Sequence, residues 1–197
     1  VHFYPVLSPA EKSAALRLYL IFAEALTRAG VSFFLRAGSL LGTHRHHGFI
    51  PWDDDIDIAV NVTDWRKVLE TLACVEGHFL LVQTNMHWVF FESSNRYPFI
   101  DLFFYTENNQ YIYAVTQYTR RTFVLIKSEV FPLTEGQFEG IPVPIPGHTG
   151  VILRKQYDFD DCVSRSSDHR TGDSFDDIIS VPCSSLKYMY KMYNLNS

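Results

Sequence analysis

The chain has 197 residues, a length typical of one domain, and 47% of them are hydrophobic, which excludes disorder of the whole chain. Lys and Arg number 17 against 22 Asp and Glu, a formal net charge of −5. This balance argues against nucleic acid or an anionic membrane as a general partner, since both need a basic surface. No apolar run of about 18 residues predicts a membrane span.

The first element expected in the chain is a helix that begins at Pro9. Ser8 suits the N-cap, Pro9 suits the first helical position, and Glu11 closes a capping box. Apolar residues then recur at helical spacing as far as Leu26, and Gly30 suits the end of the helix.

The middle of the chain then predicts short strands alternating with helices, and becomes rich in strands after residue 79. The expected elements are a strand at 31–35, a helix from Leu40, a polar loop at 44–52, a strand at 56–60, a helix at 64–74, and strands at 79–82, 88–91, 99–105, 111–115 and 122–126. Asn108-Asn109 suits a hairpin turn, and the proline-rich stretch 131–146 predicts a constrained loop or edge hairpin. Helices are expected at 151–157 and 186–193, with a polar segment at 164–177 between them.

The cysteines point to no metal site. Cys74, Cys162 and Cys183 form no CxxC pair, so a zinc knuckle is not expected, and one disulfide is compatible with an oxidising compartment. Asn61-Val62-Thr63 is a glycosylation sequon, a weak hint of passage through a secretory pathway.

An acidic strand carries the main chemical signal. Because alternate side chains of a strand share a face, Asp53, Asp55 and Asp57 are expected to point one way, while Ile56 and Ile58 point into the core. Like charges packed on one face repel each other unless a cation lies among them. Mg²⁺ accepts carboxylate oxygens and retains open positions for phosphate, so this pattern predicts a divalent metal site.

Two other interpretations fit the acidic strand less well. A solvated acidic turn is common for an isolated DxD, but here the carboxylates lead directly into an apolar strand. The calcium loop of an EF-hand fits the spacing of the acids, but it requires Gly where Ile58 stands and Glu where Asp64 stands.

A third acid, Asp101, lies within an otherwise apolar strand. An unpaired buried carboxylate costs several kcal/mol, so Asp101 needs a partner. A metal shared with Asp55 and Asp57 would supply one, and a salt bridge to Arg96 or Arg120 is the alternative.

Gly38-Ser39, between a strand and a helix, suits phosphate binding, because glycine allows close approach and the first N–H groups of a helix face an anion. The order of strand, Gly-Ser, helix, loop, acidic strand and later acid is the layout of a nucleotidyltransferase site.

These residues resemble the LicD family, which includes bacterial phosphocholine transferases and the animal fukutin and fukutin-related proteins. The resemblance rests on Gly38-Ser39-Leu40-Leu41-Gly42, Arg45-His46, Gly48-Phe49-Ile50-Pro51-Trp52-Asp53-Asp54-Asp55-Ile56-Asp57, Ile100-Asp101-Leu102-Phe103, Phe131-Pro132-Leu133 and Phe138-Glu139-Gly140. It covers roughly residues 31–157.

The resemblance implies an α/β fold of the nucleotidyltransferase type, with a central mixed β-sheet flanked by helices. The length of the chain predicts one domain over 1–197, and its part at 158–197 is expected to be loosely ordered. The resemblance also implies transfer of a phospho-alcohol, such as phosphocholine or ribitol phosphate, from a CDP-activated donor to a hydroxyl of a glycan or glycoprotein, with Mg²⁺ or Mn²⁺.

By position, the resemblance assigns metal binding and catalysis to Asp55, Asp57 and Asp101, and donor binding to Gly38, Ser39 and Arg45. It further implies a Golgi or secretory location in an animal and a cytoplasmic one in a bacterium, with any membrane anchor outside this sequence. Two alternatives stay open: an NTP-dependent nucleotidyltransferase that uses the same metal site, and a non-catalytic relative that binds a glycan or a partner protein.

Overall fold

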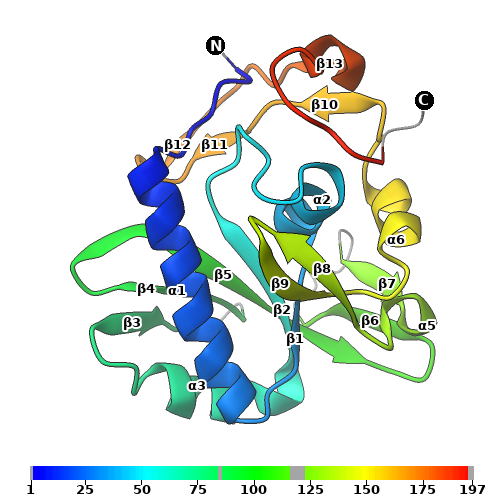
Figure 1. Ribbon diagram of the computed structural model, residues 1–197. Coiled ribbons are helices and arrows are strands. Elements are labelled where there is room, and N and C mark those ends of the chain that lie inside the picture. Colours follow the sequence, from blue (N-terminus) through cyan, green and yellow to red (C-terminus); the bar gives the residue numbers. More distant parts are fainter. Residues whose placement is uncertain (1, 84–85, 116–122, 195–197) are drawn as a thin grey trace.

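The computed structural model describes residues 2–83, 86–115 and 123–194, which form a mixed β-sheet with helices on both faces (Figure 1). The helices are α1 Pro9–Arg28, α2 Ala37–Arg45, α3 Trp65–Leu72, α5 Lys127–Val130 and α6 Thr149–Gln156, with 3₁₀ turns η1 Val62–Asp64 and η2 Cys183–Leu186. The strands of the main sheet are β1 Phe33–Leu35, β2 Ile56–Asn61, β3 His78–Leu81, β4 His87–Glu92, β5 Asn95–Glu107, β6 Tyr111–Ala114 and β7 Val124–Ile126. This architecture confirms the expected mixed α/β fold.

The sheet is antiparallel except at its centre. Its strand order is β1-β2-β5-β4-β3, and the second half of the long strand β5 also pairs with β6, which pairs with β7. The strands β2 and β5 run parallel, and their register places Asp57 opposite Asp101.

Alternation along β2 divides the side chains between two cores. Ile56, Ile58 and Val60 are fully buried in a cluster with Phe22 of α1, which lies across one face of the sheet (Figure 1). Ala59 packs into a second cluster on the opposite face, together with apolar residues of α2 and α6. Asp57 alternates with the Ile side chains, so it lies on this second face.

The amino-terminal helix begins as the sequence predicts. The Ser8 side chain accepts a hydrogen bond from the Glu11 N–H, the Glu11 carboxylate accepts one from the Ser8 N–H, and Pro9 occupies the first turn. Gly30, just after the helix, adopts a left-handed φ of +67°. The helix α1 therefore has the start and the end that its sequence encodes.

The remainder of the chain forms small hairpins beside the sheet. They pair β8 Thr134–Phe138 with β9 Ile141–Ile145, β10 Asp161–Val163 with β13 Ser180–Pro182, and β11 Ser167–Asp168 with β12 Asp173–Ser174. The first is the edge hairpin expected at 131–146. We expected loose order after residue 158, but Cys162 and Cys183, both fully buried, form a disulfide in this part of the chain.

The start of one predicted helix and the existence of another were wrong. The helix α2 begins at Ala37 rather than Leu40, because Gly and Ser are tolerated in a first turn, where the N–H groups have no partners within the helix. No helix forms at 186–193 within the described residues. Instead, the Tyr190 hydroxyl donates to the Phe3 carbonyl at 2.6 Å and the Tyr193 N–H donates to the Arg45 carbonyl at 2.8 Å.

Candidate functional site

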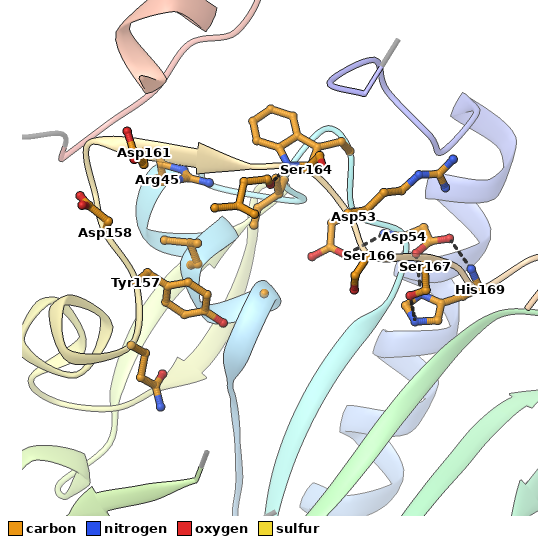
Figure 2. Close-up of a pocket in the computed structure, with 17 residues that line it drawn as sticks. Arg45, Asp53, Asp54, Tyr157, Asp158, Asp161, Ser164, Ser166, Ser167 and His169 are labelled. Carbon is orange, nitrogen blue, oxygen red and sulfur yellow. Dashed lines mark hydrogen bonds and ion pairs between the residues drawn. The ribbon is translucent and has the colours of Figure 1, made fainter. Parts of the chain in front are cut away.

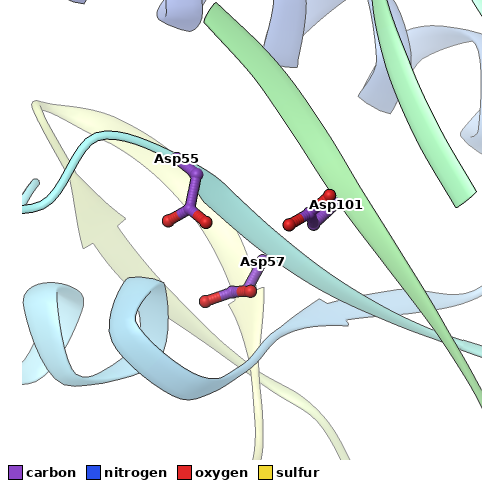
Figure 3. Close-up of side chains that lie close together, drawn as sticks. All are labelled: Asp55, Asp57 and Asp101. Atoms are coloured by element: carbon purple, nitrogen blue, oxygen red, sulfur yellow. The ribbon is translucent and has the colours of Figure 1, made fainter. Parts of the chain in front are cut away.

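Three carboxylates meet at the parallel centre of the sheet (Figure 3). Oxygens of Asp55, Asp57 and Asp101 lie within 4.8 Å of one another. Asp55 directly precedes β2, Asp57 is its second residue, and Asp101 comes from the neighbouring strand β5. The three residues expose only 9%, 8% and 7% of their surface, so the group is nearly enclosed.

Burial and mutual repulsion raise the pKa values of three acids of this strand, Asp53, Asp55 and Asp57. Desolvation first, and then the neighbouring acids, raise the pKa of Asp55 well above its usual value. Desolvation likewise raises the pKa of Asp57 to about 6, although Arg36 opposes the change. Desolvation and Asp57 raise the pKa of Asp53 to about 7. A group of this kind suits a hard divalent cation, because an ion would supply the missing positive charge and accept carboxylate oxygens.

The start of α2 holds Asp57 in place. The Ser39 hydroxyl accepts a hydrogen bond of 2.9 Å from the Asp57 backbone N–H, and the Gly38 N–H donates to the Asp57 carboxylate. A Cβ atom at Gly38 would lie 2.4 Å from Asp53 Oδ2, so only glycine leaves Asp53 undisturbed. In this structure, the Gly-Ser turn predicted to face a phosphate contacts the acidic strand.

Two side chains that the sequence did not single out, Arg36 and His87, lie beside the acids. Arg36, the N-cap of α2, has its guanidinium 4.2 Å from the centre of the Phe103 ring and is attracted to Asp57 and Asp101. His87 stacks on Phe103 and places Nε2 at 2.9 Å from Asp101 Oδ1.

Of the two arginines predicted as alternative partners of Asp101, only Arg96 lies among the described residues. Arg96 lies over the Phe91 ring, and Arg120 lies outside the described residues. In the sequence, Arg36 could be noticed only as a charged residue at the end of an apolar strand. His87 could be placed beside Asp101 only with the strand register, which sets His87 opposite Phe103.

Arg45 was expected on a loop, but it lies in the last turn of α2 and exposes only 4% of its surface. Its Nη1 donates to Cys183 Sγ at 3.5 Å, and burial lowers its pKa to about 10. The neighbouring histidines have separate ring partners: His44 contacts Phe159, His46 contacts Trp52 and His47 stacks on Tyr193. They form no shared metal site in the described part of the chain.

A cavity of about 470 Å³ has Asp53 and Asp54, which directly precede Asp55, among its lining residues (Figure 2). One wall comes from α2 and the loop after it, including Gly38, Arg45 and Asp53. Another wall contains Tyr157, whose pKa rises to about 12 because of burial and nearby Asp57. The carboxy-terminal segment supplies the remaining wall and includes His169.

Asp54, the middle residue of Asp53-Asp54-Asp55, contacts the carboxy-terminal segment. Asp54 is 2% exposed and accepts from His169 Nδ1 at 2.6 Å, from the His169 N–H at 3.3 Å and from the Tyr97 hydroxyl at 3.4 Å. Its hydrogen bond and charge raise the pKa of His169. No motif or spacing in the sequence pointed to this contact.

Comparison with known proteins places these features in a family. Residues 30–148 match the family model described as LicD/FKTN/FKRP, nucleotidyltransferase domain. An uncharacterized protein of Rickettsia typhi is 28% identical over 148 residues, covering 73% of this chain and 46% of that protein. A second, from Rickettsia prowazekii, is 28% identical over 151 residues, covering 73% and 54%. The chain thus spans about half the length of these curated relatives.

Shorter matches reach proteins with named activities. The lipopolysaccharide cholinephosphotransferase LicD of Haemophilus influenzae is 33% identical over 60 residues, 30% of this chain and 23% of that protein. The mouse ribitol 5-phosphate transferase FKRP is 49% identical over 39 residues, 20% of this chain and 8% of that protein. Among solved structures, ANT(2")-Ia in complex with adenylyl-2"-tobramycin aligns with a TM-score of 0.48 and 12% identity, covering 71% of this chain and 74% of that one. In the described residues, no helix has the length and apolar character needed to cross a membrane.

Proposed function

This chain belongs to the LicD/FKTN/FKRP nucleotidyltransferase family, and from that premise we propose that it transfers a phospho-alcohol from a CDP-activated donor to a hydroxyl of a glycan or glycoprotein. The observation that carries the proposal is the set of three carboxylates within 4.8 Å. The adjacent Asp53 and Asp54 line a cavity together with the buried Arg45. The named transferases among the relatives, which move choline phosphate or ribitol 5-phosphate, support this class of reaction.

The proposed reaction is a displacement at phosphorus. The acceptor hydroxyl oxygen bonds to the phosphorus that carries the alcohol, the bond from that phosphorus to the bridging oxygen breaks, and CMP leaves. The hydroxyl proton is released to solvent or to a nearby base. Negative charge gathers on the departing CMP, so the site must offer positive charge and fixed geometry.

Asp55, Asp57 and Asp101 are proposed to hold Mg²⁺ or Mn²⁺, because their donor atoms are all carboxylate oxygens and their charge is unbalanced. A bound ion of this class would stabilise negative charge on the phosphates. Ser39 would hold the Asp57 backbone, Gly38 would orient the Asp57 carboxylate, and the charge of Arg36 would limit the repulsion between Asp57 and Asp101.

Arg45 is proposed to contact the donor phosphates. Its guanidinium lines the cavity, and burial makes a charge-assisted hydrogen bond to an anion stronger than at an exposed site. Gly38 lines the same cavity, whereas Ser39 would act through Asp57 rather than on the donor directly. The buried disulfide supports placing the protein in an oxidising compartment such as a secretory lumen.

Donor profiling tests the proposal. Purified protein with Mg²⁺ is incubated with a glycan acceptor and with CDP-choline, CDP-ribitol or each NTP, and products are followed by mass spectrometry. Phospho-alcohol on the glycan with CMP release supports the proposal, whereas pyrophosphate release from an NTP would favour the nucleotidyltransferase alternative. Asp57→Asn should lose transfer, and the exposed Asp176→Asn is the matched control. No turnover with any donor, combined with glycan binding, would favour the non-catalytic alternative.

A further inference from the structure

The carboxy-terminal wall of the cavity is a separately anchored segment. We call residues 161–183 the strap, and they lie beyond the part of the chain that matches the family model, residues 30–148. The Cys162–Cys183 disulfide and the pairing of β10 with β13 close the strap at its base. Trp52 Nε1 donates to the Val163 carbonyl at 2.8 Å, which fixes the strap to the loop before the acidic strand.

The far end of the strap is attached through His169. The three hydrogen bonds that Asp54 accepts, two from His169 and one from Tyr97, occupy both of its carboxylate oxygens. Next to His169, Arg170 pairs with Glu11 of α1 at 2.8 Å. Asp54 therefore acts as a positioning residue: it adjoins Asp55 in sequence but binds the strap, whereas Asp55 faces the other acids.

Between these two attachments, the strap presents small polar groups to the cavity. Figure 2 shows Ser166, Ser167 and His169 beside Asp53, with Tyr157 on the opposite side. His169 Nδ1 is engaged by Asp54, while Nε2 lies 3.4 Å from the Ser167 hydroxyl. Hydroxyl and imidazole groups both donate and accept hydrogen bonds, which matches them to the hydroxyls of a sugar or polyol.

The cavity is poorly suited to a quaternary ammonium group. Such a cation is recognised by the open faces of several aromatic rings. Among the described lining residues the aromatic rings, apart from the His169 imidazole, are Trp52 and Tyr157. Trp52 is only 3% exposed and is packed against Phe3 and Tyr190, which leaves Tyr157 without a second open ring.

We propose that the strap, held by His169 on Asp54, is the recognition wall for a polyhydroxylated substrate group, contacted by Ser166, Ser167 and His169. The inference rests on the proposed function, because it takes the cavity to be the substrate site. The hydroxylated group is either the alcohol carried by the donor or the sugar of the acceptor. Both offer the same chemistry to the strap.

Calorimetry with three cytidine probes tests the recognition. The variants are Ser166→Ala/Ser167→Ala and His169→Ala, and Ser174→Ala, exposed on the same strap, is the control. We expect the wild type to bind CDP-ribitol more tightly than CDP-choline, and the first two variants to lose about tenfold in affinity for CDP-ribitol with CMP affinity unchanged. Binding of methyl hexoside to the CMP-loaded protein is measured in the same way. If the variants lose affinity only for methyl hexoside, the proposal is supported and the acceptor sugar is the group recognised.

Three results would contradict the recognition wall. Equal affinity of the variants and Ser174→Ala for CDP-ribitol and for methyl hexoside would overturn the recognition wall while leaving the proposed function intact. An equal loss for CMP and CDP-ribitol would also overturn it, because the strap would then act on the nucleotide. If the wild type bound no cytidine nucleotide at all, the proposed function itself would fail, and the recognition wall with it.

Limited proteolysis tests the attachment without any ligand. Trypsin cleaves after arginine, and Arg165 and Arg170 lie in the strap on either side of the Asp54 contact. In the oxidised protein, His169→Ala should be cut at these sites several times faster than the wild type and Ser174→Ala. Unchanged cleavage would refute the role of Asp54 and His169 in holding the strap.

Discussion

Asp55→Asn is expected to have opposite effects on stability with and without metal. The substitution preserves the shape of the side chain and removes one charge from the acid group. Asp55 is the clearest position for this test, because the cationic group nearest to it, His169 Nδ1, is 3.7 Å away and already bound to Asp54. The variant should therefore relieve repulsion without leaving a cation unpaired.

The size of the effect follows from the distances. Two unit charges 4.8 Å apart repel by about 3 kcal/mol at the effective dielectric constant of about 20 that suits such sites. Asp55 has two such neighbours, Asp57 and Asp101, but proton binding relieves part of the repulsion, since its pKa is raised. We expect the variant to gain about 1–3 kcal/mol without metal, which corresponds to about 3–10 °C in Tm for a chain of this length.

Differential scanning calorimetry in EDTA and in excess Mg²⁺ measures the change in Tm without and with the metal. Magnesium at about 100 times its Kd should stabilise the wild type by about 2.7 kcal/mol, and this gain should nearly vanish in Asp55→Asn. Asp176→Asn, an exposed acid outside the group, should respond like the wild type. A lower Tm of Asp55→Asn in EDTA, or an undiminished response to magnesium, would refute the reasoning.

Three further predictions concern the donor side and pH. Arg45→Met fills the buried space without the charge. Calorimetry should show that CMP binding weakens by about tenfold or more, while Tm stays unchanged or rises. Unchanged affinity for CMP would remove Arg45 from the donor site. Gly38→Ala should lower CMP affinity several-fold by displacing Asp53, although alanine favours the helix, and an unaltered Kd would contradict this. In EDTA, Tm should rise as pH falls from about 8 to about 5.5. The folded pKa values of Asp53, about 7, and Asp57, about 6, lie above the usual 3.8, so the stability they contribute at low pH is lost as pH rises through these values. A flat profile would argue that the acids are not desolvated.

Local signals in the sequence identified much of the fold. The capping box at Ser8 and the alternation of Ile56 and Ile58 with Asp57 depend on near neighbours, so they could be recognised without a structure. The meeting of Asp57 with Asp101 was suspected from the cost of burying a lone carboxylate, but the parallel pairing of β2 with β5 that produces it became visible only in the structure.

Contacts between distant segments escaped sequence reasoning. His169 lies 115 positions from Asp54, and no periodicity or motif links the two. The predicted helix at 186–193 was wrong for a related reason: Cys183 is tied to Cys162, and Tyr190 to Phe3, and these tertiary contacts outweigh local helical preference. Arg45 was predicted to lie on a loop, far from the core. Its burial depends on contact with Cys183 of the strap, and the sequence does not specify where the strap lies.

The parallel pairing at the centre of the sheet has a consequence for folding kinetics. The strands β2 and β5 can pair only after segment 62–94, which includes α3, β3 and β4, has closed into a crossover. Contacts between residues so far apart in the sequence form slowly, because the chain loses loop-closure entropy before the strand pairing compensates for the loss. Asp57 and Asp101 therefore come together only when the central topology is complete. Recovery of tight magnesium binding during refolding would then follow the rate-limiting assembly of the sheet rather than the earlier formation of α1.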